Sequence, residues 1–185
     1  DATTAIEAYR QALAIEPNNP DAHLGLATAL TQAGRISEGV EEYRTASRLR
    51  PNDPVLHMSL ANALRATEDV IHAIQEYRQA VQLRPAQVDY RFALALALRQ
   101  AGDYGGAIQE LHRVIRQQPE HTVAHAELAA AYLSTANHPA AAAEYREAIR
   151  LKPEDPELHE NLGLVLRKTG DLVGGIAALR KAVEL

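Results

Sequence analysis

Hydrophobic and polar positions recur along this chain with a fixed period, and prolines mark it. Five prolines stand 34 residues apart, at Pro17, Pro51, Pro85, Pro119 and Pro153. When each unit is numbered so that its proline is position 32, positions 7, 8 and 11 form one apolar stripe and positions 20, 24, 27 and 28 form a second. Both stripes have the spacing of a helix face. The pattern predicts two helices per unit, which we call A and B.

Small residues and turn residues separate these two helices. Position 8 of successive units is Ala27, Ala61, Ala95, Ala129 and Gly163, which indicates that helices A and B approach each other closely. Position 15, between the stripes, is glycine in three units, where it suits the left-handed end of a helix. The proline ends helix B because it lacks an N–H and disfavours helix for the residue before it. Each unit is therefore predicted to be an antiparallel helix pair.

This pattern resembles the tetratricopeptide repeat family along the whole chain, most clearly in AIEAYRQALAIEPNNPDAHLGLATAL and AAAEYREAIRLKPEDPELHENLGLVL. The resemblance implies an all-α, right-handed superhelical solenoid of antiparallel helix pairs with about eleven helices. We expect one domain over residues 1–185, with an orphan B helix in 1–19 and repeats over 20–53, 54–87, 88–121, 122–155 and 156–185. Neither end shows a polar capping helix, which favours a fragment of a longer protein with uncapped ends.

Composition narrows the possible functions. The chain has no cysteine, which excludes disulfides and thiolate catalysis. A net charge of −5 argues against nucleic-acid binding, which needs a basic face. No apolar run approaches the roughly 18–20 residues of a membrane span, so we expect no membrane insertion. No targeting segment is recognised, which favours the cytoplasm without fixing the compartment.

No catalytic motif is present, neither a nucleophile elbow, a phosphate loop nor a zinc-protease pattern, so we expect no enzymatic activity and no cofactor. Position 4 of the A helices holds four histidines and one arginine: His23, His57, Arg91, His125 and His159. Equivalent residues of successive repeats are separated by two helices of about 8–10 Å each, too far to share one metal ion. We interpret these histidines as packing residues and expect no metal site.

In the family that this chain resembles, the A helices line a concave surface that binds peptides or extended segments. The resemblance implies candidate peptide-binding residues on the first three repeats: Leu24, Met58, Asn62, Arg65, Phe92, Leu96 and Arg99. The apolar members would hold apolar side chains, while the arginines would bind acidic ones. Repeats 4 and 5 offer Ala126, Ala130 and Glu160 at matching places, from which we expect weaker anchorage.

The sequence thus predicts a protein–protein interaction scaffold that binds an extended or helical protein or peptide segment in the groove of the A helices. Two alternatives stay open. The chain could be an accessory module of an enzyme, such as a glycosyltransferase, or it could form homo-oligomers through its uncapped ends. The candidate residues also have a simpler interpretation, in which Met58 and Phe92 pack internally and the arginines stabilise helix C-termini.

Overall fold

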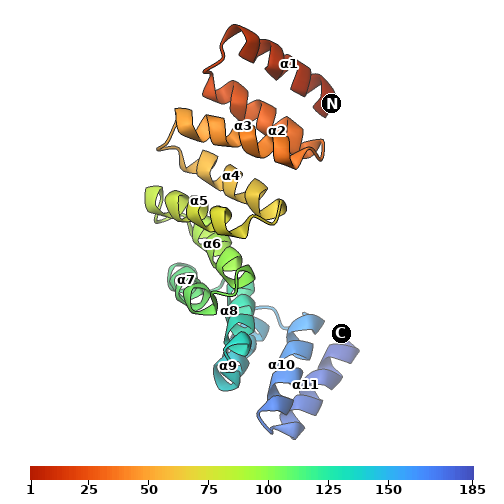
Figure 1. Ribbon diagram of the computed structural model, residues 1–185. Coiled ribbons are helices and arrows are strands. Elements are labelled where there is room, and N and C mark those ends of the chain that lie inside the picture. Colours follow the sequence, from red (N-terminus) through yellow and green to blue (C-terminus); the bar gives the residue numbers. More distant parts are fainter. The chain divides into compact units, whose positions relative to one another are not determined.

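The computed structural model describes residues 1–185 as helices joined by short turns, with no strand (Figure 1). The helices are α1 (Ala2–Ile15), α2 (Pro20–Gln32), α3 (Ile36–Leu49), α4 (Pro54–Ala66), α5 (Val70–Leu83), α6 (Val88–Gln100), α7 (Tyr104–Gln117), α8 (Thr122–Ser134), α9 (His138–Leu151), α10 (Pro156–Lys168) and α11 (Leu172–Glu184). These eleven helices confirm the predicted all-α solenoid class.

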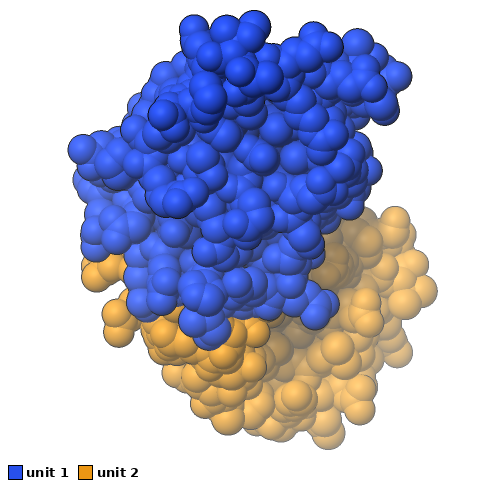
Figure 2. All heavy atoms as spheres, turned by 45° about the horizontal axis from the view of Figure 1, so that its top comes forward, with its two compact units in different colours: residues 1–90 blue, residues 91–185 orange.

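The chain divides into two compact units, residues 1–90 and residues 91–185 (Figure 2). Unit 1 contains α1 to α5 and the first residues of α6, and unit 2 contains the remainder. Each unit has a core of its own, with Ile6 and Leu26 buried in unit 1 and Leu158 and Leu166 buried in unit 2. The single domain predicted over residues 1–185 stays a prediction.

Three of the five A helices, α2, α4 and α10, begin where a polar residue is followed by proline. The Asn19 side chain accepts hydrogen bonds from the backbone N–H groups of Asp21 and Ala22, each at 3.1 Å. Asp53 and Asp155 cap α4 and α10 in the same way. Such caps each stabilise a helix by about 1 kcal/mol because they satisfy N–H groups that have no partner in the helix. Local sequence therefore fixes where these helices start.

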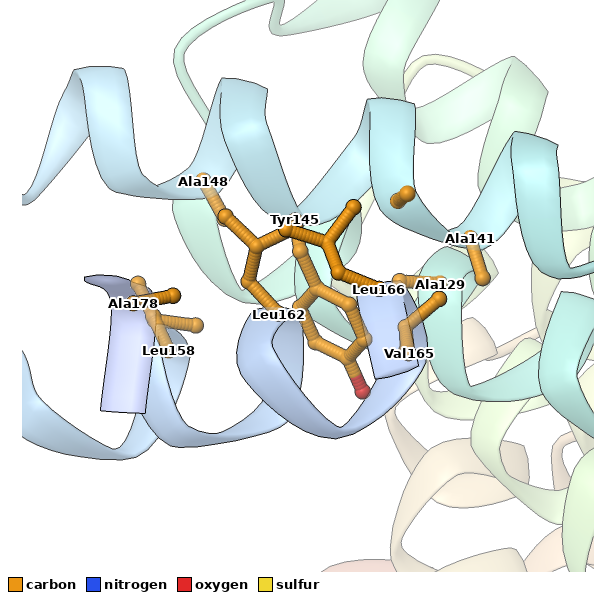
Figure 3. Packing of buried hydrophobic residues seen from close by; sticks show 10 residues of the cluster. Ala129, Ala141, Tyr145, Ala148, Leu158, Leu162, Val165, Leu166 and Ala178 are labelled. Carbon is orange, nitrogen blue, oxygen red and sulfur yellow. The ribbon is translucent and has the colours of Figure 1, made fainter. Parts of the chain in front are cut away.

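Small residues allow the helices of each repeat to pack closely, as predicted. Ala27, Ala61 and Ala129 at position 8 are fully buried, as are Ala73 and Ala141 at position 20. In unit 2 this packing continues into a cluster in which Tyr145 of α9 meets leucines of α10 (Figure 3). The leucines are Leu158, Leu162 and Leu166. The residues of this cluster come from α8, α9, α10 and α11.

Position 15 ends each A helix in the left-handed backbone region. Glycine fills it with φ of 79° at Gly34, 82° at Gly102 and 87° at Gly170. The other two repeats use Glu68 with φ 64° and Ala136 with φ 58°. A side chain at such φ costs about 1–2 kcal/mol, because its Cβ crowds the backbone. The turn therefore imposes this conformation even where no glycine is available.

Replacing Ala136 with glycine is expected to raise the free energy of unfolding by about 0.5–1 kcal/mol, because relief of this crowding exceeds the added flexibility of the unfolded chain. Urea denaturation followed by circular dichroism measures the change. The reverse substitution, Gly102→Ala, should lower the free energy of unfolding by a similar amount. Equal stabilities of all three proteins would contradict this account of the turn.

Candidate functional site

The histidines at position 4 join three segments of the chain through both ring nitrogens. Nδ1 of His23, His57 and His125 lies 2.6, 2.6 and 2.7 Å from a glutamate of the following B helix. The glutamates are Glu42, Glu76 and Glu144. Nε2 of the same rings lies 2.9, 2.9 and 3.0 Å from the carbonyl oxygens of Pro17, Pro51 and Pro119. We call this arrangement the histidine clasp.

Two repeats vary the clasp. Arg91 replaces histidine in the third repeat and forms an ion pair with Glu110 at 2.6 Å. His159 keeps the bond to the Pro153 carbonyl at 2.8 Å, but Ala178 stands where the other repeats have glutamate. Both ring nitrogens of His23, His57 and His125 thus have partners within the chain, whereas His159 has a partner only at Nε2. No three His, Asp or Glu side chains are grouped to hold a metal ion. The predicted packing role takes the form of specific hydrogen bonds.

Of the predicted binding residues, four lie in unit 1. Leu24 and Met58 are half-buried on α2 and α4. Asn62 is exposed, and its side-chain oxygen accepts a hydrogen bond of 2.5 Å from the Tyr77 hydroxyl. Arg65 is also exposed and lies near the same hydroxyl. Asn62 and Arg65 therefore meet at Tyr77.

The other three predicted residues lie on α6 in unit 2, and two of them, Phe92 and Arg99, have partners within the chain. Phe92 is half-buried, with its ring centroid 4.9 Å from that of His121. Nε of Arg99 lies 2.9 Å from Oε2 of Glu127, although the angle between them does not make a hydrogen bond. Leu96 is half-buried. Arg99 is thus partly neutralised by an internal carboxylate before any partner binds.

A hollow of about 520 Å³ lies on the A helices of repeats 4 and 5, where the sequence predicted weaker anchorage. We call it the α8–α10 hollow. Its lining residues are Arg99, Thr122, Val123, Ala126, Glu127, Ala130, Tyr145, Lys152, Asp155, Glu157, Leu158 and Asn161. Ala126 and Ala130 occupy positions 5 and 9, where longer side chains would fill this space. Arg99 is the one predicted binding residue that also lines it.

Tyr145 brings a hydroxyl without a partner into this hollow. In repeats 1 and 2 the equivalent hydroxyls of Tyr43 and Tyr77 are bonded by position 9, through Thr28 at 3.1 Å and Asn62 at 2.5 Å. Position 9 of repeat 4 is Ala130, which has no polar side-chain atom. The Tyr145 hydroxyl consequently has no hydrogen bond within the chain, although the residue is only 4% exposed. The hydroxyl therefore remains available to a polar group of a bound molecule.

The surroundings of Tyr145 keep its hydroxyl protonated. Burial raises the pKa of the Tyr145 phenol, and the carboxylates of Glu127 and Glu157 raise this pKa further, while Arg99 opposes them. At neutral pH the hydroxyl is therefore a hydrogen-bond donor. A carbonyl or carboxylate oxygen is the group that such a donor binds.

A second hollow of about 470 Å³ adjoins the first, and we call it the α10–α11 hollow. It is lined by Leu133, Asn161, Leu164, Val165, Arg167, Lys168 and Leu172. Asn161 belongs to both hollows, and its side-chain amide has no hydrogen bond within the chain. An amide presents one acceptor and two donors, which matches the C=O and N–H of a peptide group. We call the two hollows together the unit 2 groove.

Sequence reasoning missed most of this groove. The sequence did contain a signal for it. In the repeats of Tyr43 and Tyr77, position 9 is a polar residue, whereas in the repeat of Tyr145 it is Ala130. The expectation of weaker anchorage at Ala126 and Ala130 considered only the contacts that their own side chains could make with a partner. The structure shows that its small size creates space.

Comparison with known proteins agrees with this architecture. Two tetratricopeptide repeat family models match the chain, one over residues 1–63 and 98–165 and the other over residues 58–122. The chain belongs to the tetratricopeptide repeat family. Among curated proteins no sequence match was found.

Solved structures of other tetratricopeptide repeat proteins have the same fold at low sequence identity. MamA of Desulfovibrio magneticus matches with a TM-score of 0.84 and 20% identity, over 90% of this chain and 94% of that chain. YrrB, described as a protein with an unusual peptide-binding site, matches with a TM-score of 0.81 and 16% identity, over 97% and 93%. PilF of Pseudomonas aeruginosa matches with a TM-score of 0.73 and 19% identity, over 89% and 75%. At these identities the likeness shows the fold.

Membership of this family supports a role of the chain in protein–protein interaction, because tetratricopeptide repeat proteins are generally non-catalytic scaffolds. None of the helices combines the length and the apolar character that a bilayer crossing requires.

Proposed function

We propose that this protein is an interaction scaffold without catalysis of its own, which binds a peptide segment of a partner protein on its A helices. The unit 2 groove supplies the binding site. The observation that carries the proposal is the Tyr145 hydroxyl, which is protonated and has no partner within the chain, in a hollow that Ala126 and Ala130 leave open. Together with the free amide of Asn161, it provides groups that suit a peptide backbone.

An extended segment fits these groups better than a helical one. A helix satisfies its own backbone groups, whereas an extended chain leaves them available to Tyr145 and Asn161. Apolar side chains of the segment would enter the space beside Ala126 and Ala130. The seven residues predicted from the sequence remain proposed contacts, with Arg99 at the edge of the groove and the others as further parts of the A-helix surface.

The test is to fill the hollow without disturbing the fold. Peptides are first selected by the protein from a random displayed library, and their dissociation constants are then measured by fluorescence anisotropy. In the Ala130→Thr variant a hydroxyl meets Tyr145, as Thr28 meets Tyr43, so we expect at least about tenfold weaker binding with stability preserved. Tyr145→Phe removes only the donor and should weaken binding about fivefold.

Ala143→Thr is the matched control, because it makes the same change at an exposed position of α9 outside the groove. It should bind as the unmodified protein does. Failure of the library to yield any specific peptide would overturn the proposal, and so would equal binding by the Ala130→Thr variant and its control.

A further inference from the structure

The unit 2 groove is electrically asymmetric. The α8–α10 hollow is lined by three carboxylates and two cations: Glu127, Asp155, Glu157, Arg99 and Lys152. Its formal charge is therefore −1, from three negative and two positive groups. The cations there are also occupied, since Arg99 pairs with Glu127 at 2.9 Å and Lys152 with Asp155 at 2.8 Å. This half of the groove offers no free positive charge.

The α10–α11 hollow has the opposite character. Its charged residues are Arg167 and Lys168, which give it a formal charge of +2. Both side chains are exposed, and neither forms an ion pair or a hydrogen bond within the chain. Their place in the last turn of α10 stabilises that helix without any ligand, as at other helix ends. Here, however, the two cations also stand at the edge of an apolar space.

That space is bounded by aliphatic side chains. Leu133, Leu164, Val165 and Leu172 line it, and two of them are unusually accessible, with Leu164 42% and Leu172 59% exposed. An aliphatic side chain placed among them would remove apolar surface of both partners from water, at about 25 cal/mol for each Å². Asn161 lines both this space and the hollow that contains Tyr145, so the two hollows adjoin at its side chain.

We infer that the α10–α11 hollow takes an aliphatic side chain of the bound segment and that Arg167 and Lys168 bind an acidic residue next to it. The inference rests on the proposed function, since it names the peptide class that the unit 2 groove selects. A carboxylate is recognised because both cations are free to donate charge-assisted hydrogen bonds, and the arginine can do so with two parallel bonds. A basic residue at the same place is repelled, which gives discrimination as well as affinity.

A displayed random heptapeptide library tests the inference directly. Selection on the unmodified protein should enrich peptides with leucine, isoleucine or valine adjacent to aspartate or glutamate. Selection on the double variant Arg167→Glu/Lys168→Glu should instead enrich lysine or arginine at the acidic position. For one selected peptide, replacing the acidic residue by its amide should weaken binding to the unmodified protein about tenfold, with less effect at high salt.

The double variant Arg180→Glu/Lys181→Glu is the matched control. It makes the same change of net charge at exposed positions of α11 outside the groove, so its selected peptides should keep the acidic residue. If the charge-reversed variant does not fold by circular dichroism, Arg167→Gln/Lys168→Gln replaces it, with loss of the acidic preference expected. Peptides without an acidic preference on the unmodified protein would overturn this inference and leave the proposed function standing. No enriched peptide at all would overturn the proposed function itself.

Discussion

Replacing Leu128 with alanine should lower the free energy of unfolding by about 2–5 kcal/mol. Leu128 lies at position 7 of α8 and is completely buried. Its truncation removes apolar contacts and leaves a cavity, because helices joined in short hairpins can close around it only in part. Chemical denaturation with circular dichroism measures the loss.

Leu164→Ala makes the same chemical change on another A helix, α10, at position 9 of its repeat instead of position 7. Leu164 is 42% exposed and lines the α10–α11 hollow, so its truncation should cost less than about 1 kcal/mol of stability. The Leu164→Ala substitution should nevertheless weaken the binding of a peptide whose aliphatic side chain enters this hollow. Similar destabilisation by the two substitutions would show that Leu164 is a core residue and that the α10–α11 hollow is not a preformed space.

Most of the fold could be predicted from the sequence because its determinants are local. The prolines, the apolar stripes and the caps such as Asn19 act within one helix or one turn. The left-handed end of each A helix was also foreseeable from Gly34, Gly102 and Gly170. Even Glu68 and Ala136 adopt that conformation, since the 34-residue period positions them in the same turn.

The candidate site was less predictable because it depends on pairs of residues that are distant in the sequence. Arg99 was expected to be free for a partner, but its companion Glu127 stands on the next A helix of the chain. The α8–α10 hollow depends on a missing partner for Tyr145, and a missing group leaves no pattern unless the repeats are compared position by position. The histidines were interpreted as packing residues, yet their glutamate and proline partners became evident only in three dimensions.

The histidine clasp should contribute measurably to stability. Oε2 of Glu42 lies 2.6 Å from Nδ1 of His23, and both side chains are largely buried, at 29% and 12% exposure. The two ring nitrogens of His23 lie within hydrogen-bond distance of the Glu42 carboxylate and of the Pro17 carbonyl, which ties helix A, helix B and the preceding turn together. Glu42→Ala should therefore lower the free energy of unfolding by about 1–2 kcal/mol, since it leaves a buried donor without its partner.

Glu41 provides a control on the same helix. Its carboxylate is 76% exposed and lies 3.8 Å from Arg44, so Glu41→Ala should change stability by less than about 0.5 kcal/mol. A double-mutant cycle between Glu42→Ala and His23→Ala should give a coupling of about 1 kcal/mol, because the two substitutions remove the same interaction. A coupling near zero, or equal losses from Glu41 and Glu42, would mean that the clasp only accompanies the packing of the helices. A clear coupling would show that the hydrogen bonds of position 4 stabilise the repeats in addition to the packing of their apolar stripes.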